Sequence, residues 1–275
     1  MRLSPDDVSQ QAEVNRRPSR AKVRGPAIDD AYIRNIVLAC PDPAALGSFY
    51  AELLGMRIIR TDWFVIAADE NSSPRLAFDR EAGFRPPRSG DPENPRQLHL
   101  DLASRDLDTA EELAIQLGAT RLREKGHDRS YADPAGHPFC LYAEPEDSNR
   151  VNAPPPCRIG RVVYECFSPR AVATFYEELL SMHVRKNDSE HWVVIARDDR
   201  AGPDLAFQYA VFQAPRWPDP KYPEQIHLDL HVDDSVSAQA LVLSLGAIGL
   251  PAQGGSCPVF ADPAAHPFCL CAPGQ

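Results

Sequence analysis

Alternating and helical runs of apolar residues give the first stretch of the chain a simple order of elements. The predicted elements are a strand at 33–40, a helix at 43–54, and short strands at 63–67 and 75–78. Asp42 stands where its side chain can cap the helix, and Gly55 stands where the helix should end. The pattern therefore predicts one strand–helix–strands unit.

The same order of patterns returns three more times. The predicted elements are, in the second unit, a strand at 98–102, a helix at 107–117 and strands near 120–122 and 139–142; in the third, 162–166, 169–180, 192–196 and 205–208; in the fourth, 226–230, 235–245 and 268–271. Gly118 and Gly246 end the second helix of each half. Such units bury one sheet face under helices and leave the other face concave.

Two long motifs repeat in the second half of the chain. Residues 97–102 return at 225–230 and residues 132–141 return at 261–270, with offsets of 227 − 99 = 128 and 269 − 140 = 129. This period is too long for a solenoid repeat, so it indicates a duplicated domain. We predict an α+β fold of two tandem domains, each with two βαβββ units forming a concave mixed sheet with helices on the outside. The predicted ranges are a disordered basic tail at 1–28, domain one at 29–146, a linker at 147–156 and domain two at 157–275.

Strand parity predicts which side chains face each concave surface. Leucines alternate with His99 and Asp101 in one repeat and with His227 and Asp229 in the other. The leucines should face the helices, which directs both histidines into the concavity. A histidine there can contact a ligand or be satisfied by a cross-strand partner, and its presence in both copies favours a function.

Composition narrows the class of protein. With 25% charged residues and a net charge of −10, the 275-residue chain has the composition of a soluble protein and is unsuited to non-specific nucleic-acid binding. The sequence has no apolar run of membrane-spanning length and no apolar signal segment, so we expect a cytoplasmic protein. Seven cysteines without a CxxC pair argue against a disulfide framework in that compartment.

Several short motifs together carry a family resemblance. They are Phe49-Tyr50 and Phe175-Tyr176 in the first helices, Pro203–Gln208, Ala214–Pro218, both Gln-Leu/Ile-His-Leu-Asp-Leu strands, and both Ala-Asp-Pro-x-x-His-Pro-Phe-Cys-Leu endings. Over residues 31 to 272, the chain resembles the vicinal oxygen chelate superfamily of glyoxalases, bleomycin-resistance proteins and extradiol dioxygenases, and within it the glyoxalase-like subgroup common in actinobacteria. The resemblance is specific for the fold and much less so for a reaction, because one fold hosts many chemistries.

The resemblance also implies where a metal would lie, because metalloenzymes of the superfamily bind a divalent ion through His, Glu or Gln on the first and last strands of the units. The matching positions are Asn35, Asp79, His99 and Cys140 in domain one, and Arg161, Gln208, His227 and Cys269 in domain two. Arg161 would repel a cation, so no metal is expected in domain two. If a metal is present, we expect a weak zinc site of His99, Asp79 and Cys140 in domain one. The prediction preferred on these residues is that the protein has no functional metal and no cofactor.

Other chemistry finds little support in the sequence. No phosphate-binding, zinc-protease or nucleophile-elbow motif is present. His137 and His266 follow Asp-Pro in the two repeated turns, where we expect them to stabilise the turn. Cys140 and Cys269 have no basic neighbour in the sequence, so nucleophilic thiol catalysis is not indicated.

The preferred function is binding of a small aromatic or planar molecule, as in bleomycin-resistance-like members of the superfamily. The expected ligand-binding residues are His99, Asn35 and Asp79 in domain one and His227, Gln208, Arg161 and Tyr164 in domain two, with Trp217 as an aromatic wall. One alternative is a lyase, isomerase or dioxygenase that uses a divalent metal, or His99 or His227 as an acid–base group. Another is a structural or regulatory module. A homodimer is possible, and the sequence leaves open whether the units pair within one chain or exchange across a dimer.

Overall fold

The computed structural model contains the four predicted units, each a strand followed by a helix and three more strands. It describes residues 31–88, 91, 93–122, 129–144, 157–199, 202–211, 214–219, 221–251 and 255–274. The predicted tail at 1–28 and the predicted linker at 147–156 lie outside the described residues.

The bounds of the elements follow the repeat. The first unit holds β1 (Tyr32–Cys40), α2 (Pro43–Leu54), β2 (Arg57–Arg60), β3 (Phe64–Ala67) and β4 (Arg75–Arg80); the second holds β5 (Leu98–Ser104), α3 (Leu107–Gln116), β6 (Thr120–Arg121), β7 (Ser130–Ala132) and β8 (Pro138–Ala143). The third holds β9 (Arg158–Cys166), α4 (Pro169–Leu180), β10 (His183–Ser189), β11 (Trp192–Ala196) and β12 (Asp204–Tyr209); the fourth holds β13 (Ile226–His231), α5 (Ser235–Ser244), β14 (Ile248–Leu250), β15 (Val259–Ala261) and β16 (Pro267–Cys271).

Local signals set the ends of the helices. Asp42 Oδ1 accepts hydrogen bonds from the N–H groups of Ala44 and Ala45, both at 3.2 Å, and Gly55 ends α2 in the left-handed conformation with φ 59°. Both signals were predicted. The strands β2, β7, β10, β14 and β15 were not predicted, because they are short or largely exposed and carry little apolar alternation.

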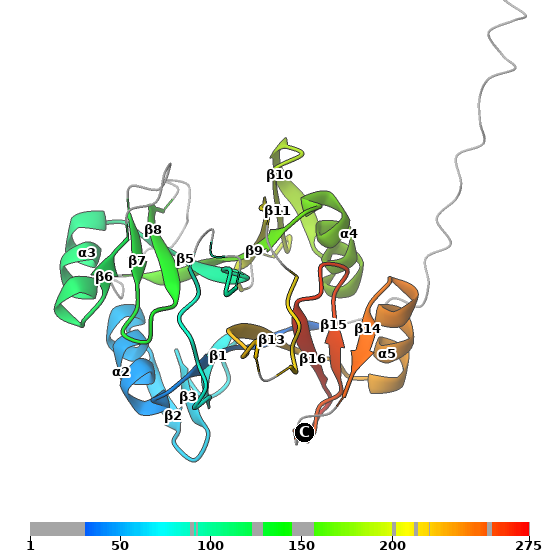
Figure 1. Cartoon of the computed structure of the whole chain (residues 1–275), viewed down its shortest axis with the longest axis horizontal. Helices are drawn as coiled ribbons and strands as arrows, with labels where there is room; N and C mark the ends of the chain where they lie inside the picture. Colours follow the sequence, from blue (N-terminus) through cyan, green and yellow to red (C-terminus); the bar gives the residue numbers. More distant parts are fainter. Residues whose placement is uncertain are drawn as a thin grey trace, which may run out of the picture.

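The strands form two eight-stranded mixed sheets, and each sheet combines units from both halves of the chain (Figure 1). Sheet 1 has the order β14-β15-β16-β13-β1-β4-β3-β2 and joins the first unit to the fourth; sheet 2 has the order β10-β11-β12-β9-β5-β8-β7-β6 and joins the second to the third. The junctions are the antiparallel pairs β1–β13 and β5–β9. The α+β class and the tandem domains are as predicted, and the exchange of units takes place within one chain.

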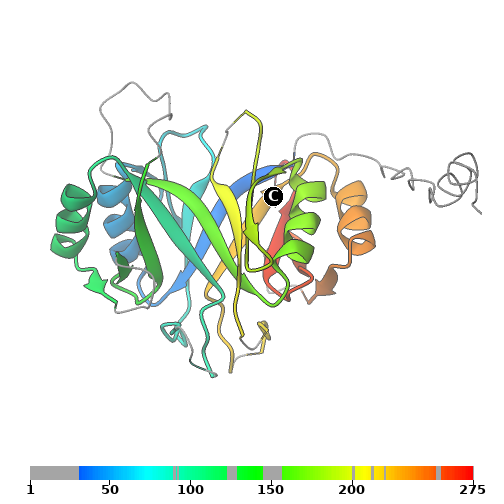
Figure 2. The same ribbon diagram turned by 90° about the horizontal axis from the view of Figure 1, so that it is seen from above.

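The helices lie on the outside and meet in pairs. Figure 2 shows α2 beside α3 at one end of the molecule and α4 beside α5 at the other. The units of one sequence half therefore pack together through their helices, while their strands belong to different sheets. A single large cluster of buried apolar side chains runs through this arrangement.

The repeated Asp-Pro-x-x-His turns connect the two sheets. Asp133 Oδ1 accepts the backbone N–H groups of Ala135, Gly136 and His137 at 2.8–2.9 Å, and Tyr50 Oη donates to Asp133 Oδ2 at 2.9 Å. The ring of His137 reaches β1 in sheet 1, with Nε2 2.8 Å from the carbonyl oxygen of Ala39. His137 lies in the turn as predicted, but its ring links the turn to the opposite sheet, and the hydrogen bonds that close the turn come from Asp133.

The second copy of the turn makes the matching contacts. Tyr176 Oη donates to Asp262 Oδ2 at 3.3 Å, and His266 Nε2 lies 3.0 Å from the carbonyl oxygen of Glu165 on β9. Because both imidazoles are fully buried, these contacts hold the two sheets together from inside the core.

One sequence prediction about the cysteines is wrong. Cys257 and Cys271 form a disulfide, with their Cα atoms 4.9 Å apart. Pairing of β15 with β16 brings the segment before β15 next to the end of β16, and this proximity depends on strand pairing that cysteine spacing does not reveal. Cys40, Cys157 and Cys166 are buried thiols, and burial raises the pKa of Cys157 to about 12.

Within the described residues, no helix combines the length and the apolar character needed to cross a lipid bilayer.

Candidate functional site

The inward face of each sheet carries one group of polar side chains at matching positions. In sheet 1 the group, called the acidic cup here, comprises Asn35 on β1, Asp79 on β4, Glu224 just before β13, His227 and Asp229 on β13, and Cys269 on β16. In sheet 2 the group, called the arginine cup, comprises Arg96 just before β5, His99 and Asp101 on β5, Cys140 on β8, Arg161 and Glu165 on β9, and Gln208 on β12.

In the acidic cup, carboxylates flank both nitrogens of His227. Its Nδ1 lies 2.7 Å from Glu224 Oε1, and its Nε2 lies 3.3 Å from Asp229 Oδ1. Asn35 Nδ2 donates to Asp229 Oδ2 at 2.8 Å, which fixes the second oxygen of that carboxylate. The imidazole ring is thus held in one orientation between two acids.

The charge of His227 follows from these neighbours. Burial alone lowers its pKa, but the charge of Glu224 and hydrogen bonds to Asp229, Cys269 and Glu224 outweigh burial and raise the pKa well above its usual value. Burial acts to raise the pKa of Asp229, yet hydrogen bonding and charge from His227 leave it lowered. The acidic cup therefore holds an imidazolium beside ionised carboxylates at neutral pH.

A cavity of about 790 Å³ opens over the acidic cup. His227, Asp229 and Cys269 line it, together with Trp63 and Trp217 and the edge of the Cys257–Cys271 disulfide. Trp63 Nε1 donates to Asp79 Oδ1 at 2.5 Å. Burial raises the pKa of Asp79, an effect that the Trp63 hydrogen bond partly opposes. The cavity combines aromatic walls with a polar floor.

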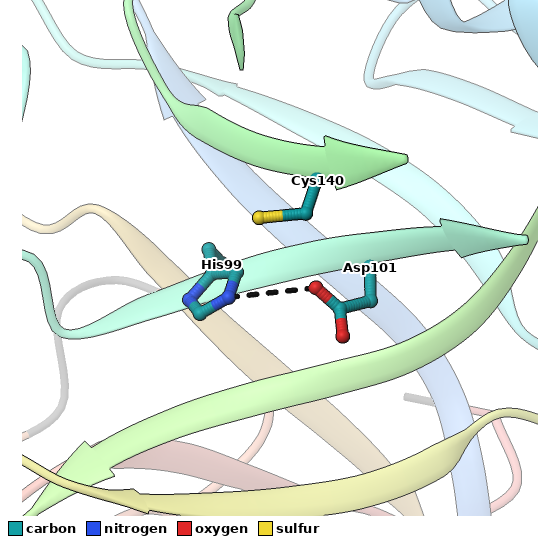
Figure 3. A group of neighbouring side chains, drawn as sticks. All are labelled: His99, Asp101 and Cys140. Carbon is teal, nitrogen blue, oxygen red and sulfur yellow. Dashed lines mark ion pairs between the residues drawn. The ribbon is translucent and has the colours of Figure 1, made fainter. Parts of the chain in front are cut away.

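The arginine cup has a different arrangement. His99 Nε2 lies 3.5 Å from Asp101 Oδ1, with Cys140 across the strand pair (Figure 3). Arg161 Nη1 lies 3.3 Å from Asp101 Oδ2, and its guanidinium stacks 4.2 Å from the ring centre of Tyr142. Burial acts to raise the pKa of Asp101, but His99 and Arg161 leave it lowered, so Asp101 stays ionised.

A second arginine is buried in the arginine cup. Arg96 forms an ion pair with Glu165, and both side chains are less than a tenth exposed. Arg96 stands at the position of Glu224 in the other repeat (224 − 96 = 128). The two cups thus differ in charge at a buried position.

Strand exchange regroups the predicted site residues. Asn35, Asp79, His227 and Trp217 share the acidic cup, and His99, Arg161 and Gln208 share the arginine cup. Asp79 does not lie with His99 and Cys140, because β4 and β5 belong to different sheets. The predicted zinc set of His99, Asp79 and Cys140 is therefore not assembled.

Tyr164 does not face a cup, and its prediction as a ligand-binding residue is wrong. Its side chain is 1% exposed and packs in the core, with ring centres of Tyr176 and Phe207 at 5.2 and 5.3 Å. On β9 it lies between Val163 and Glu165, so strand alternation turns it toward the helices. Consistent use of strand parity would have excluded it.

Glu224, Arg96 and Glu165 belong to the cups, but no motif in the sequence singled them out. The available signal was the difference between the repeats, since Pro95-Arg96-Gln97 corresponds to Pro223-Glu224-Gln225. No basic residue is adjacent to Cys269 in the sequence, whereas the structure brings the His227 imidazole into hydrogen-bonding contact with that thiol.

Comparison with known proteins agrees with this architecture. A family model described as a glyoxalase-like domain matches residues 35–142 and again residues 161–271. The chain belongs to this glyoxalase-like family. The double match confirms the predicted membership of the vicinal oxygen chelate superfamily with two tandem domains. None of the curated proteins matches the sequence.

Solved structures share the glyoxalase-like fold at low sequence identity. Glyoxalase I from Zea mays is 18% identical with a TM-score of 0.60, covering 88% of this chain and 92% of that one. The E144Q mutant of that enzyme is also 18% identical, with a TM-score of 0.59, and the match covers 87% of this chain and 93% of that one. A putative dioxygenase from Bacillus subtilis subsp. subtilis str. 168 is 14% identical, with a TM-score of 0.57, and the match covers 88% of this chain and 85% of that one. At these identities the likeness establishes the fold alone.

The acidic cup of this glyoxalase-like chain has donors that fit a divalent metal. One ligand atom each of His227, Asp229 and Cys269 lie within 4.8 Å of one another, and Glu224 holds the far nitrogen of the imidazole. A carboxylate on the second nitrogen is the usual support of a metal-binding histidine.

The arginine cup does not fit a metal. His99, Asp101 and Cys140 lie equally close together, but the Asp101 carboxylate already forms an ion pair with the Arg161 guanidinium, whose positive charge would repel a metal ion. The expectation that domain two is the half without a metal rested on placing Arg161 with His227. Strand exchange separates these two residues, so that reasoning is wrong.

Proposed function

We propose that the protein binds a small planar molecule in the acidic cup. The observation that carries the proposal is the cavity of about 790 Å³ that Trp63 and Trp217 line together with the His227 cluster. Aromatic walls with a few fixed polar groups are typical of small-molecule sites. Asn35, Asp79 and His227, all predicted from the sequence, belong to this site.

Four arginines line the cavity together with its acidic side chains, so the charge preference comes from the carboxylates beside His227, which favour a donor-rich or positively charged group at that point. Asp79, Glu224 and Asp229 surround a single imidazolium, and a planar cation would also be attracted to the tryptophan faces. The proposed ligand class is therefore a planar aromatic molecule with a cationic or donor-rich group that contacts these carboxylates.

Benzamidine and benzoate test this proposal, because they have nearly the same shape and opposite charge. Isothermal titration should show benzamidine binding that is weakened about tenfold in Asp79→Asn, which keeps an acceptor for Trp63 but removes the charge, whereas benzoate binding should not weaken in that variant. The matched control is Gln208→Ala at the corresponding position of the arginine cup, which should leave benzamidine binding unchanged. Benzamidine that fails to bind, or that responds only to Gln208→Ala, would contradict the proposal.

A second candidate function is that of a metal-dependent lyase, isomerase or dioxygenase at the same cup. The specific observation in its favour is the contact of Glu224 with His227, together with Asp229 and Cys269 around the same imidazole. His227, Asp229 and Cys269 would hold the ion, which would supply Lewis-acid polarisation of a substrate oxygen. Asn35 orients Asp229, and Glu224 holds the proton on Nδ1 of His227.

Metal content separates the two candidates. Protein purified without a histidine tag is analysed by inductively coupled plasma mass spectrometry and then titrated with Co²⁺. The second candidate predicts close to one metal per chain and a thiolate-to-cobalt charge-transfer band that Cys269→Ser removes and Cys140→Ser leaves in place. Trace metal with no such band would contradict the second candidate and leave the first unaffected.

A further inference from the structure

The arginine cup repeats the framework of the acidic cup but changes its chemistry at four positions. In the strand registers, Asp101 faces Arg161 as Asp229 faces Asn35. Gln208 pairs with Glu165 as Asp79 pairs with Ala39. The third change is Arg96 in place of Glu224, and the fourth is Glu165 in place of Ala39; these two new charges form an ion pair with each other. The changes at Arg161 and Gln208 add a positive charge and remove a negative one, so the arginine cup lacks the acidic excess of the other cup and can accept an anion at Arg161.

Three polar atoms of the arginine cup are buried without a hydrogen-bond partner among the described residues: His99 Nδ1, Arg161 Nε and Gln208 Oε1. His99 is only 1% exposed. In the acidic cup, His227 Nδ1 also lacks a hydrogen bond of good geometry, but it lies 2.7 Å from a carboxylate oxygen of Glu224. Buried polar groups in native proteins are nearly always paired, so three unpaired atoms on one face indicate a missing partner.

The missing partner can reach Arg161. Its side chain is 27% exposed and its Nη1 contacts the Asp101 carboxylate, while its buried Nε has no hydrogen-bond partner among the described residues. The stacked ring of Tyr142 fixes the plane of the guanidinium. Gly160 makes room for that ring, since a Cβ there would lie 2.0 Å from Tyr142 Oη. A guanidinium held in this way is pre-organised for a carboxylate.

An aromatic wall lies beside the unpaired atoms. Trp192 on β11 is the direct cross-strand neighbour of Gln208, and it packs over Val163 and Ala206. An amide side chain offers both a donor and an acceptor, so Gln208 can contact a carboxylate with its NH₂ group and a hydroxyl with its oxygen.

We propose that the arginine cup is a second ligand site, which binds the carboxylate of a small aromatic acid through the Nε edge of Arg161 and the amide of Gln208. The ring of the acid lies toward Trp192, and His99 Nδ1 supplies a further polar contact. The chain then carries two sites of opposite charge preference. This inference does not depend on the function proposed for the acidic cup.

Benzoate is the probe, and two variants with opposite expected effects test the site. Arg161→Met removes the charge and should weaken benzoate binding at least about tenfold in isothermal titration. Asp101→Asn removes the carboxylate that competes for Arg161 and should strengthen binding by a few-fold. The matched control Asp229→Asn makes the same change in the acidic cup and should leave benzoate affinity unaltered. Uncharged benzamide should bind more weakly than benzoate.

Asp101→Asn keeps the test decisive if Arg161→Met fails to fold, because it retains Arg161; thermal melting identifies a folding failure. Benzoate that does not bind, that binds no better than benzamide, or that binds less well to Asp101→Asn would overturn the proposal. Since Asp79→Asn should change benzamidine binding and leave benzoate binding intact, failure here is distinguishable from failure of the acidic-cup proposal.

Discussion

His137 Nε2 lies 2.8 Å from the carbonyl oxygen of Ala39, a residue of the opposite sheet and 98 positions earlier in the chain. Together with Tyr50, which donates to Asp133 in the same turn, this contact links the first unit to the second through polar groups inside an apolar core. The repeated turn is therefore a structural connection, and its stability can be measured.

Replacing Tyr50 by Phe should destabilise the protein by about 1–3 kcal/mol, because it leaves one oxygen of buried Asp133 without that donor. Tyr176→Phe should lower the free energy of unfolding by less, since the hydrogen bond from Tyr176 to Asp262 is longer, at 3.3 Å. Urea unfolding followed by circular dichroism measures both. Two variants as stable as the parent protein would show that the hydroxyls contribute nothing to the turns.

Gly47→Ala should destabilise the protein although alanine favours helices. A Cβ at Gly47 would lie 2.2 Å from Phe64 Cε1, so the ring must move, at a cost of about 1–3 kcal/mol. The second half has Ala173 and Val193 at the corresponding positions (173 − 47 = 126, 193 − 64 = 129). In urea unfolding, the double variant Gly47→Ala, Phe64→Val should recover most of the stability that Gly47→Ala loses. A double variant less stable than both single variants would refute the packing argument.

The contribution of His227 to stability should depend on pH. Its pKa is raised by folding, so its stabilising effect is complete below the unfolded value of about 6.5 and is lost as the pH rises through the folded value. The stability gap between the parent protein and His227→Gln should therefore be widest near about pH 6. It should shrink at higher pH, by up to about 1.4 kcal/mol per pH unit. A gap that stays constant from acid to alkaline pH in urea titrations would rule out a paired imidazolium.

Opening the disulfide should loosen the wall of the acidic cup. Cys257 and Cys271 close a loop with a sequence separation of 14, for which chain entropy gives about 3 kcal/mol. Cys257→Ser should lower the melting temperature and make it insensitive to dithiothreitol, whereas the parent protein should lose stability when dithiothreitol is added. A parent protein that melts identically with and without the reductant would mean that the bond contributes no stability.

Local signals were enough to predict much of the fold. The bounds of α2 and α4 agree with the predicted ranges, because proline near the start and a capping or left-handed residue at the end act within a few positions. Strand alternation correctly turned His99 and His227 inward.

The grouping of the site residues could not be predicted in the same way. β1 has the same alternation whether it pairs with β5 or with β13, so the pattern contains no information about its partner. Asp79 was therefore grouped with His99, and Arg161 with His227, although each lies in the other cup. The disulfide escaped prediction for the same reason, because it depends on the pairing of β15 with β16.

The exchange of units inside one polypeptide also bears on how the two cups could have diverged. In a symmetric dimer of identical shorter chains, every substitution would appear in both cups at once. Here Asn35 and Arg161 occupy equivalent positions but are encoded by separate codons, as are Glu224 and Arg96. Selection can act on one cup while the other is conserved, so gene fusion gives this architecture a route to two specificities that a homodimer lacks.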